Sequence, residues 1–132
     1  MTAKECIKGR RSIRKFKDQK ESGELLSGIV ETVSYSPSWK HTQITRYIAV
    51  DGEKKEQIAD SCAEMFANNG VIIKNAPVLM VLTYIKGRSG YERDGSFTTS
   101  KGDRWQMFDA GVACQTFCLA AHEYGLGTVI MG

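Results

Sequence analysis

The segment 105–132, "WQMFDAGVACQTFCLAAHEYGLGTVIMG", organises the rest of the chain. Its pattern predicts the longest helix of the protein, from Trp105 to Tyr124, with Gly125 in the position that follows a helix end. Many side chains of this helix are small, namely Ala110, Gly111, Ala113, Ala120 and Ala121. Because small side chains let another backbone approach closely, we expect the helix at the centre of the domain or at an interface between subunits. Residues 126–132, "LGTVIMG", predict a strand.

The N-terminal third of the chain predicts two helices. Residues 2–8 give a short helix that ends at Gly9. Residues 22–35 give a clearer one, with Ser22 available as N-cap. Its apolar side chains recur at helical spacing: Leu25, Leu26, Ile29, Val30 and Val33. Pro37 follows and ends this helix.

The middle of the chain predicts a strand, a helix and a second strand. Arg46–Val50 reads as a strand that turns at Asp51-Gly52. Glu53–Asn68 is typical of an amphipathic helix, and Asn69-Gly70 is its expected stop. The side chains expected to face inward are Ile58, Cys62, Met65 and Phe66. Pro77–Tyr84, "PVLMVLTY", is an unbroken apolar run and predicts a strand buried on both faces.

Length and composition favour one globular domain over residues 1–132. No linker or repeat divides the chain, and helices that alternate with short strands predict a mixed layered domain of the α/β or α+β class. Its composition, 42% hydrophobic and 25% charged, is ordinary for a soluble protein. No apolar run is long enough for a membrane span, and the N-terminus is unlike a signal peptide. We therefore expect a cytoplasmic protein.

A long polar segment separates the second strand from the last helix. Residues 86–104, "KGRSGYERDGSFTTSKGDR", are rich in Gly, Ser and Thr, and loops of this length are usually functional or disordered. Tyr91 and Phe97 are its only aromatic residues. They either belong to a lid that closes over a ligand or are incidental.

Positive charge is concentrated at the start of the chain. The net charge of the whole chain is +3, whereas residues 1–20 carry a balance of +6. Five of these cations surround one serine in "GRRSIRKFKD", residues 9–18: Arg10, Arg11, Arg14, Lys15 and Lys17. Nucleic-acid binders usually spread basic residues along a face or a helix. A local cluster of this kind is better suited to a small anion.

Alternation within the basic segment favours a phosphate. In an extended backbone Arg10, Ser12 and Arg14 project to the same side, where guanidinium groups and a hydroxyl together bind phosphate oxygens well. The alternative is a solvated basic face with salt bridges to Glu21 or Glu24.

Residues 35–43, "YSPSWKHTQ", follow the second helix and form another candidate binding segment. Hydroxyls, amide groups and an aromatic plane suit a flat, polar ligand, although an ordinary capping loop has a similar composition. Ser38 and His41 could suggest a nucleophile and a base. No G-x-S-x-G turn surrounds the serine and no acidic partner is evident, so serine hydrolysis is disfavoured.

The four cysteines, Cys6, Cys62, Cys114 and Cys118, contain no CxxC pair and are expected to be buried thiols rather than disulfides. Cys114, Cys118 and His122 share one face of the last helix, at i, i+4 and i+8. They span about 12 Å, too far for one zinc ion to collect all three. Two of them could share a metal only with ligands from elsewhere, and we predict no metal site.

Four motifs in this order resemble the nitroreductase family of FMN-dependent flavoproteins: "RRSIRKF", "SPSWKHTQ", "APVLMVL" and "DAGVACQTFCLAAHEYGLGTVIMG". The resemblance covers nearly the whole chain and implies an α+β sandwich, with a mixed or antiparallel sheet flanked by helices. It also implies an intertwined homodimer that holds one FMN at each end of its interface.

The resemblance assigns binding roles to three groups of residues. The first group would bind the phosphate, ribityl chain and pyrimidine edge of FMN: Arg10, Arg11, Ser12 and Arg14. The second would approach the flavin from the other subunit: Pro37, Ser38, Trp39, His41 and Gln43. The third would pass the reactive edge of the ring: Ile130, Met131 and Gly132. No catalytic side chain is implied, because FMN itself carries the hydride.

The chain also departs from the family pattern. Family members often have Asn where this chain has His41, and Pro-Trp where it has Ile44-Thr45. They also continue beyond Gly132 through a further helix and a strand, so we expect a C-terminally truncated form in which that helix and strand are missing.

Two functions follow from the resemblance. The first is an oxidoreductase that transfers a hydride from NADH or NADPH, through FMN, to a nitroaromatic, quinone or similar electrophile by a ping-pong mechanism. The alternative is a flavin carrier or degenerate homologue without efficient turnover. A basic nucleic-acid module would rest on the N-terminal charge alone.

Overall fold

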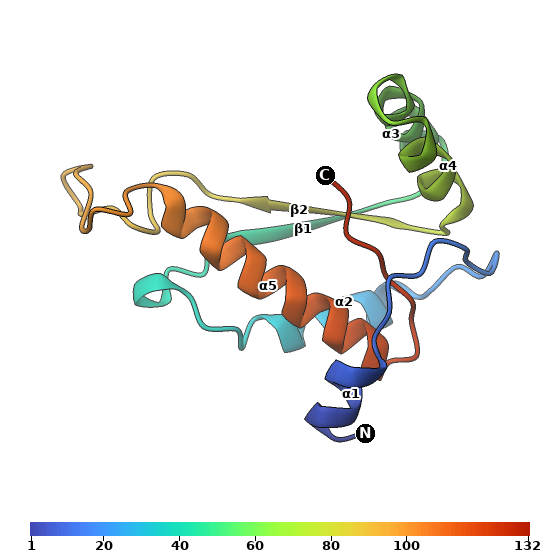
Figure 1. The fold of residues 1–132 in the computed structure, drawn as a ribbon, viewed down its shortest axis with the longest axis horizontal. Helices are drawn as coiled ribbons and strands as arrows, with labels where there is room; N and C mark the ends of the chain where they lie inside the picture. Colours follow the sequence, from blue (N-terminus) through green and yellow to red (C-terminus); the bar gives the residue numbers. More distant parts are fainter.

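Two antiparallel strands and one long helix form the framework of the computed structural model, which describes residues 1–132 (Figure 1). Strand β1 (Thr45–Val50) pairs with β2 (Leu79–Tyr84) so that Thr45 lies opposite Tyr84 and Val50 opposite Leu79. Helix α5 (Arg104–Glu123) packs on this pair, where the Phe117 and Tyr47 rings stack with centroids 5.6 Å apart. The α+β class is confirmed.

The hydrophobic core lies between α5 and α2 (Gly23–Val33), as the small residues of the long helix predict. Its buried members are Ile29, Val33, Ala113, Ala120 and Ala121. Alanines on α5 bring the two helices close enough for the branched side chains of α2 to fill the space between them. The central position expected for the long helix is therefore confirmed.

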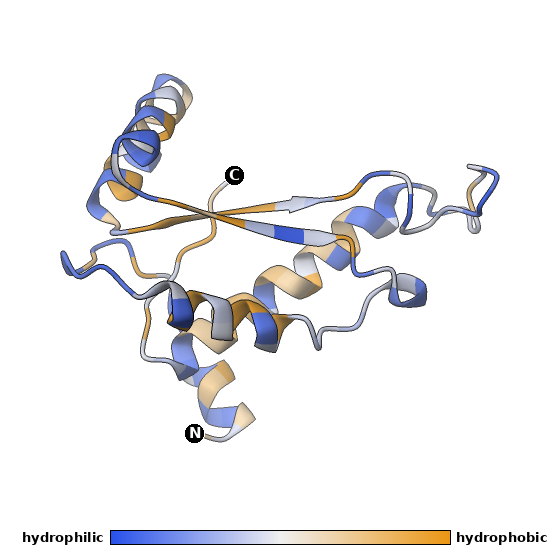
Figure 2. Cartoon of the chain, turned by 180° about the vertical axis from the view of Figure 1, so that it is seen from behind, coloured by the Kyte–Doolittle hydropathy of each residue, from blue (hydrophilic) through white to orange (hydrophobic).

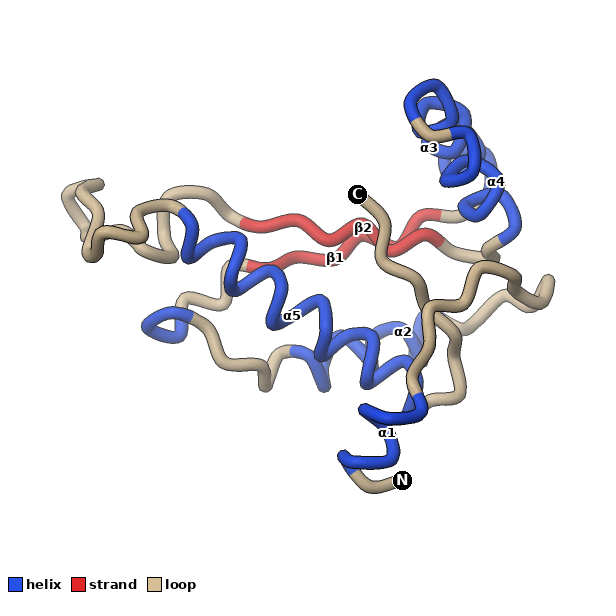
Figure 3. Tube along the Cα trace, viewed as in Figure 1, coloured by secondary structure: helices blue, strands red, loops and turns tan.

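Both N-terminal helices begin where the sequence predicts (Figure 3). Helix α1 (Ala3–Gly9) starts with a capping box, in which the Thr2 and Glu5 side chains each accept a hydrogen bond from the other residue's backbone N–H. The Ser22 hydroxyl accepts the Leu25 N–H at 3.1 Å and starts α2.

The predicted single helix over 53–68 is wrong at its C-terminal end. Helix α3 (Gly52–Met65) stops at Phe66, whose extended backbone leads directly into α4 (Ala67–Asn75). Figure 1 shows these two helices as a hairpin that stands away from α5. Met65 and Phe66, which were expected to face inward, are 79% and 55% exposed at the junction.

Gly70 lies inside α4 because the two helices of this hairpin cross closely there. A Cβ atom at Gly70 would lie 2.7 Å from the Ala59 carbonyl oxygen and 2.6 Å from the Ala63 Cβ. Lys55 holds the other end of the hairpin, where its buried ammonium group donates to the Ile73, Lys74 and Ala76 carbonyls at 3.3, 3.1 and 2.5 Å. These carbonyls end α4 and accept positive charge favourably.

Replacing Gly70 with alanine should lower the free energy of unfolding by about 1–3 kcal/mol, because the added methyl group overpacks the α3–α4 crossing. Gly23→Ala is the matched control, since nothing lies within 4 Å of a Cβ atom there. Urea unfolding of both variants measures the effect. Equal stabilities of the two variants would contradict the close crossing.

Two expectations about strands are wrong. No residue of β2 is fully buried and Thr83 is exposed, because the sheet has only two strands and α5 packs on it from one side. Figure 2 shows hydrophobic colour along much of both strands. Residues 126–132 make no ladder: a single parallel bridge joins Thr128 to Ser12, and the Ile13 N–H donates to the Thr128 carbonyl at 2.9 Å.

Residues 86–104 contain no helix or strand before α5 begins, as predicted. Tyr91 and Phe97 face each other across an isolated bridge with ring centroids 5.1 Å apart. A lid function for this loop stays a prediction. None of the helices is both long and apolar enough to cross a membrane.

Candidate functional site

The basic segment 9–18 leaves its cations without carboxylate partners. None of Arg10, Arg11, Arg14, Lys15 and Lys17 forms an ion pair. The salt bridges to Glu21 or Glu24 that the solvated-face alternative requires are therefore absent. Like charges this close repel one another unless an anion lies among them. The segment is thus suited to an anion from outside the chain.

Arg14 lines a cavity of about 450 Å³ with the end of the chain, which we call the arginine cavity. Its other walls come from α4 and from residues 129–132: Phe66, Asn68, Asn69, Ile72, Val129, Ile130, Met131 and Gly132. The backbone N–H groups of Val129–Gly132 donate to no acceptor within the chain. A guanidinium group and a row of free N–H groups together favour an anionic or electron-rich ligand.

The bridge between Ser12 and Thr128 holds the two predicted walls of this cavity together. Gly127 is required beside it, because a Cβ atom there would lie 2.9 Å from the Ile13 side chain. Arg11 differs from Arg14: its guanidinium group donates to the Lys8 and Arg10 carbonyls at 2.6 and 2.9 Å.

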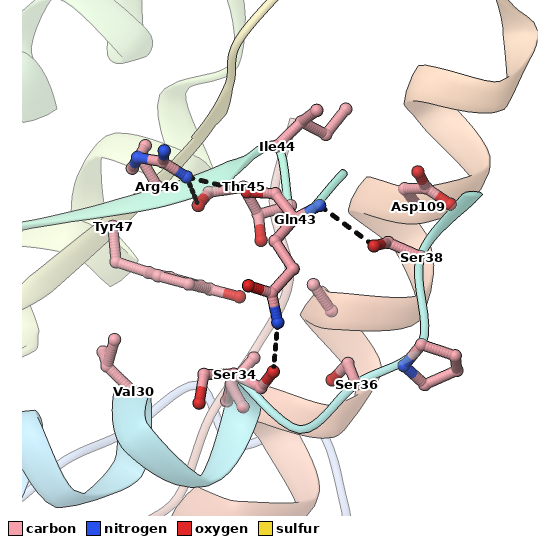
Figure 4. A pocket seen from close by; sticks show the side chains of 13 residues that line it. Val30, Ser34, Ser36, Ser38, Gln43, Ile44, Thr45, Arg46, Tyr47 and Asp109 are labelled. Atoms are coloured by element: carbon pink, nitrogen blue, oxygen red, sulfur yellow. Dashed lines mark hydrogen bonds between the residues drawn. The ribbon is translucent and has the colours of Figure 1, made fainter. Parts of the chain in front are cut away.

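The segment 36–43 forms a second cluster, around a pocket of about 350 Å³ between α2, β1 and α5 (Figure 4). The Ser38 hydroxyl accepts the Gln43 N–H at 3.0 Å, and the Gln43 side chain donates to the Ser34 carbonyl at 2.9 Å. The hydroxyl of Ser38 is thus bound to backbone, and His41 is exposed. No nucleophile and base pair is assembled here, in agreement with the sequence analysis.

The backbone of this segment is strained. Lys40, His41 and Gln43 have φ angles of 44°, 54° and 45°, in the left-handed region that side chains other than glycine rarely adopt. Each such residue costs roughly 1–3 kcal/mol, and such strain gathers at functional sites. His and Asn are both enriched among the non-glycine residues that adopt this conformation, so the backbone at position 41 accommodates histidine.

Asp109 anchors the strained segment and was missed by the sequence analysis. Its carboxylate, on the first half of α5, accepts the Trp39 N–H at 3.1 Å and the Ser89 hydroxyl at 2.6 Å. Asp109 is 3% exposed and Ser89 is fully buried. One buried carboxylate therefore ties two loops, residues 36–43 and 86–104, to the long helix.

The two clusters line separate pockets, which share no residue. Segment 36–43 is tied to Asp109, whereas the arginine cavity is lined by α4 and by residues 129–132, which return along α5 beside Cys114 and Phe117. In one protomer the two predicted groups of residues therefore lie at different pockets.

Two groups that line the arginine cavity, Asn68 and Asn69, were also missed. They lie in the first turn of α4, a helix that the sequence analysis did not predict. Their position in the cavity wall depends on α4 and on its approach to residues 129–132, and neither can be read from the local sequence.

The protein-family comparison covers both halves of the chain. The model described as "Nitroreductase family" matches residues 7–72 and 67–132. The chain belongs to the nitroreductase family. Both the family resemblance and the fold expected from it are confirmed.

Three relatives illustrate the likeness. A Methanothermobacter thermautotrophicus protein named "Putative NADH dehydrogenase/NAD(P)H nitroreductase" is 30% identical over the whole chain, which covers 61% of that relative. A crystal structure of a nitroreductase family protein from Clostridium novyi NT is 25% identical, with a TM-score of 0.78 over 98% of this chain and 68% of that one. An FMN-dependent nitroreductase from Clostridium difficile R20291 is 32% identical, with a TM-score of 0.67 over 92% of this chain and 61% of that one. The chain thus spans about three fifths of the length of the first curated relative.

Proposed function

We propose that this nitroreductase family chain binds FMN and takes part in hydride transfer from NADH or NADPH to a nitroaromatic, quinone or similar electrophile. One observation carries the proposal. The cations of segment 9–18 have no carboxylate partner, and one of them, Arg14, lines the same cavity as the free N–H groups of residues 129–132. Donors of this kind fit the phosphate and the electron-rich carbonyl edge of a flavin.

The residues present fit the cofactor at both of its polar ends. Arg10, Ser12 and Arg14 would bind the phosphate and ribityl chain, and Arg11 would join them if it leaves its backbone acceptors. Ile130, Met131 and Gly132 would present their N–H groups to the ring. Bound FMN supplies the hydride acceptor and donor that the side chains lack. The cations of this chain would hold negative charge that develops at the ring edge.

A homodimer would complete the site. The segment that contains Pro37, Ser38, Trp39, His41 and Gln43 borders a pocket that shares no residue with the arginine cavity, so a second copy would bring these residues to the flavin. Asp109 would act there as a positioning residue, because it fixes the backbone of Trp39. The nicotinamide donor and the acceptor would then occupy one open face in turn, which gives ping-pong kinetics.

The visible absorbance spectrum of the purified protein tests this function. We expect a yellow protein, either as purified or after addition of FMN, and loss of the flavin absorbance on anaerobic addition of NADH or NADPH. A colourless protein that does not bind added FMN would contradict the proposal. Bound FMN that neither donor bleaches would instead identify a flavin carrier.

A further inference from the structure

Five sulfur-containing side chains line one cavity beside α5, which we call the sulfur cavity. They come from α3, β2, α5 and the end of the chain: Cys62, Met80, Cys114, Cys118 and Met131. The cavity measures about 370 Å³, and its other walls are mainly apolar. It shares residues 129–132 with the arginine cavity as a common wall. All four cysteines of the chain are free thiols.

Cys114 and Cys118 form the reactive pair of this cavity. They are one helical turn apart on α5, a spacing that places their Cβ atoms roughly 5–6 Å from each other. Cys114 is half-buried and Cys118 is 3% exposed, and both side chains line the cavity. Such a pair holds two sulfur atoms on the same side of a rigid helix.

The surroundings stabilise one thiolate. The neighbouring Cys114 thiol lowers the pKa of Cys118, and the Thr128 hydroxyl and the charge of Arg10 act in the same direction, although burial acts in the opposite one. The hydrogen bond with Cys118, followed by burial, raises the pKa of the Cys114 thiol. A thiolate is the form that binds metal ions.

We propose that Cys114 and Cys118 bind one soft, monovalent metal ion of the Cu(I) class between their sulfur atoms. Two-coordinate Cu(I) holds its two sulfur ligands on opposite sides of the ion, and thiolates whose Cβ atoms lie roughly 5–6 Å apart can reach that arrangement. Thiolate and thioether ligands select Cu(I), and the Met80 and Met131 thioethers line the same cavity. Binding releases the remaining thiol protons, and the resulting negative complex lies near Arg10.

Zinc does not fit this arrangement. Structural zinc takes four nitrogen or sulfur ligands in a tetrahedron, whereas no group of three or more His, Cys, Asp or Glu side chains in the structure could hold a metal ion. His122 lies just over two helical turns from Cys114, so it cannot join both cysteines around one ion.

Anaerobic titration of the full chain with Cu(I), in competition with a colorimetric Cu(I) chelator, tests the site. We expect one tightly bound Cu(I) per chain, and at least about 100-fold weaker binding in Cys114→Ser and in Cys118→Ser. Cys6→Ser is the matched control: Cys6 is also buried, but its thiol donates to the Leu119 carbonyl at 3.3 Å and lies outside the cavity.

The results of this titration distinguish a Cu(I) site at Cys114 and Cys118 from its alternatives. Circular dichroism shows whether each variant folds. If Cys118→Ser does not fold, Cys114→Ser becomes the decisive variant, because the half-buried Cys114 tolerates substitution better. Equal loss of Cu(I) in the Cys6→Ser control, unchanged binding in Cys114→Ser, or no bound Cu(I) in the parent protein overturns the proposal. Flavin binding is read separately from its visible spectrum.

Discussion

Replacement of Asp109 by alanine should lower the free energy of unfolding by about 3–5 kcal/mol, a large effect for one side chain of a helix. The carboxylate accepts the Trp39 N–H and the Ser89 hydroxyl, and both donors would lose their partner. Ser89 is fully buried, so water cannot replace the lost bond without entering the core. Urea unfolding measures the change.

Two further variants give this prediction its control and its mechanism. Asp103→Ala removes a carboxylate that makes no side-chain capping bond at the start of the same helix, and its cost should stay within about 0.5 kcal/mol. Ser89→Ala and Asp109→Ala combined should cost less than the sum of the single changes, because the two side chains share one hydrogen bond. Additive costs would contradict the role given to Asp109.

Trypsin digestion tests independently whether Asp109 holds the loop 86–104 in place. Residues 86–104 contain Arg88, Arg93 and Lys101, and Asp109 holds this loop through Ser89. Release of the loop should expose its backbone, so cleavage there should be faster in Asp109→Ala than in Asp103→Ala.

Local signals in the sequence were sufficient for most helices and strands. Ser22 caps α2, Pro37 follows its end, and the small residues of α5 lie in the core, as predicted. These features depend on neighbouring residues or on one face of a helix, and such patterns can be read directly.

The failures arise where a distant contact outweighs a local signal. Asn69-Gly70 is typical of a helix end, yet Gly70 continues α4 because α3 crosses too closely for a side chain. Residues 126–132 have a strand composition, but a ladder needs a partner strand and only Ser12 offers a bridge. Neither partner can be inferred from the residues next to them.

The candidate site likewise contains features that the local sequence predicts and features that only the structure shows. The charge cluster and its predicted preference for phosphate follow from the composition of "GRRSIRKFKD", and the structure adds that no carboxylate neutralises the cluster. Asp109 gives no such signal, because it is one acidic residue within a helix and its partners, Trp39 and Ser89, are 70 and 20 residues away. The left-handed backbone at Lys40 and His41 is likewise visible only in three dimensions.

Replacing Arg14 with glutamate should weaken FMN binding by at least about 100-fold. The guanidinium group lines the arginine cavity without a carboxylate partner, so it is free to bind phosphate. A charge-assisted hydrogen bond contributes roughly 1.5–3 kcal/mol, and a glutamate would also repel the phosphate. Fluorescence titration with FMN measures the affinity, because flavin fluorescence is quenched on binding to many flavin sites. Lys15→Glu is the control, since it makes the same change in charge at the next residue.

Lys15 is exposed and lies outside the cavity, so that variant should bind FMN within about threefold of the parent because exposed charges are screened. Equal loss in both variants would indicate a diffuse basic surface instead of a site, and unchanged binding in Arg14→Glu would place the phosphate elsewhere.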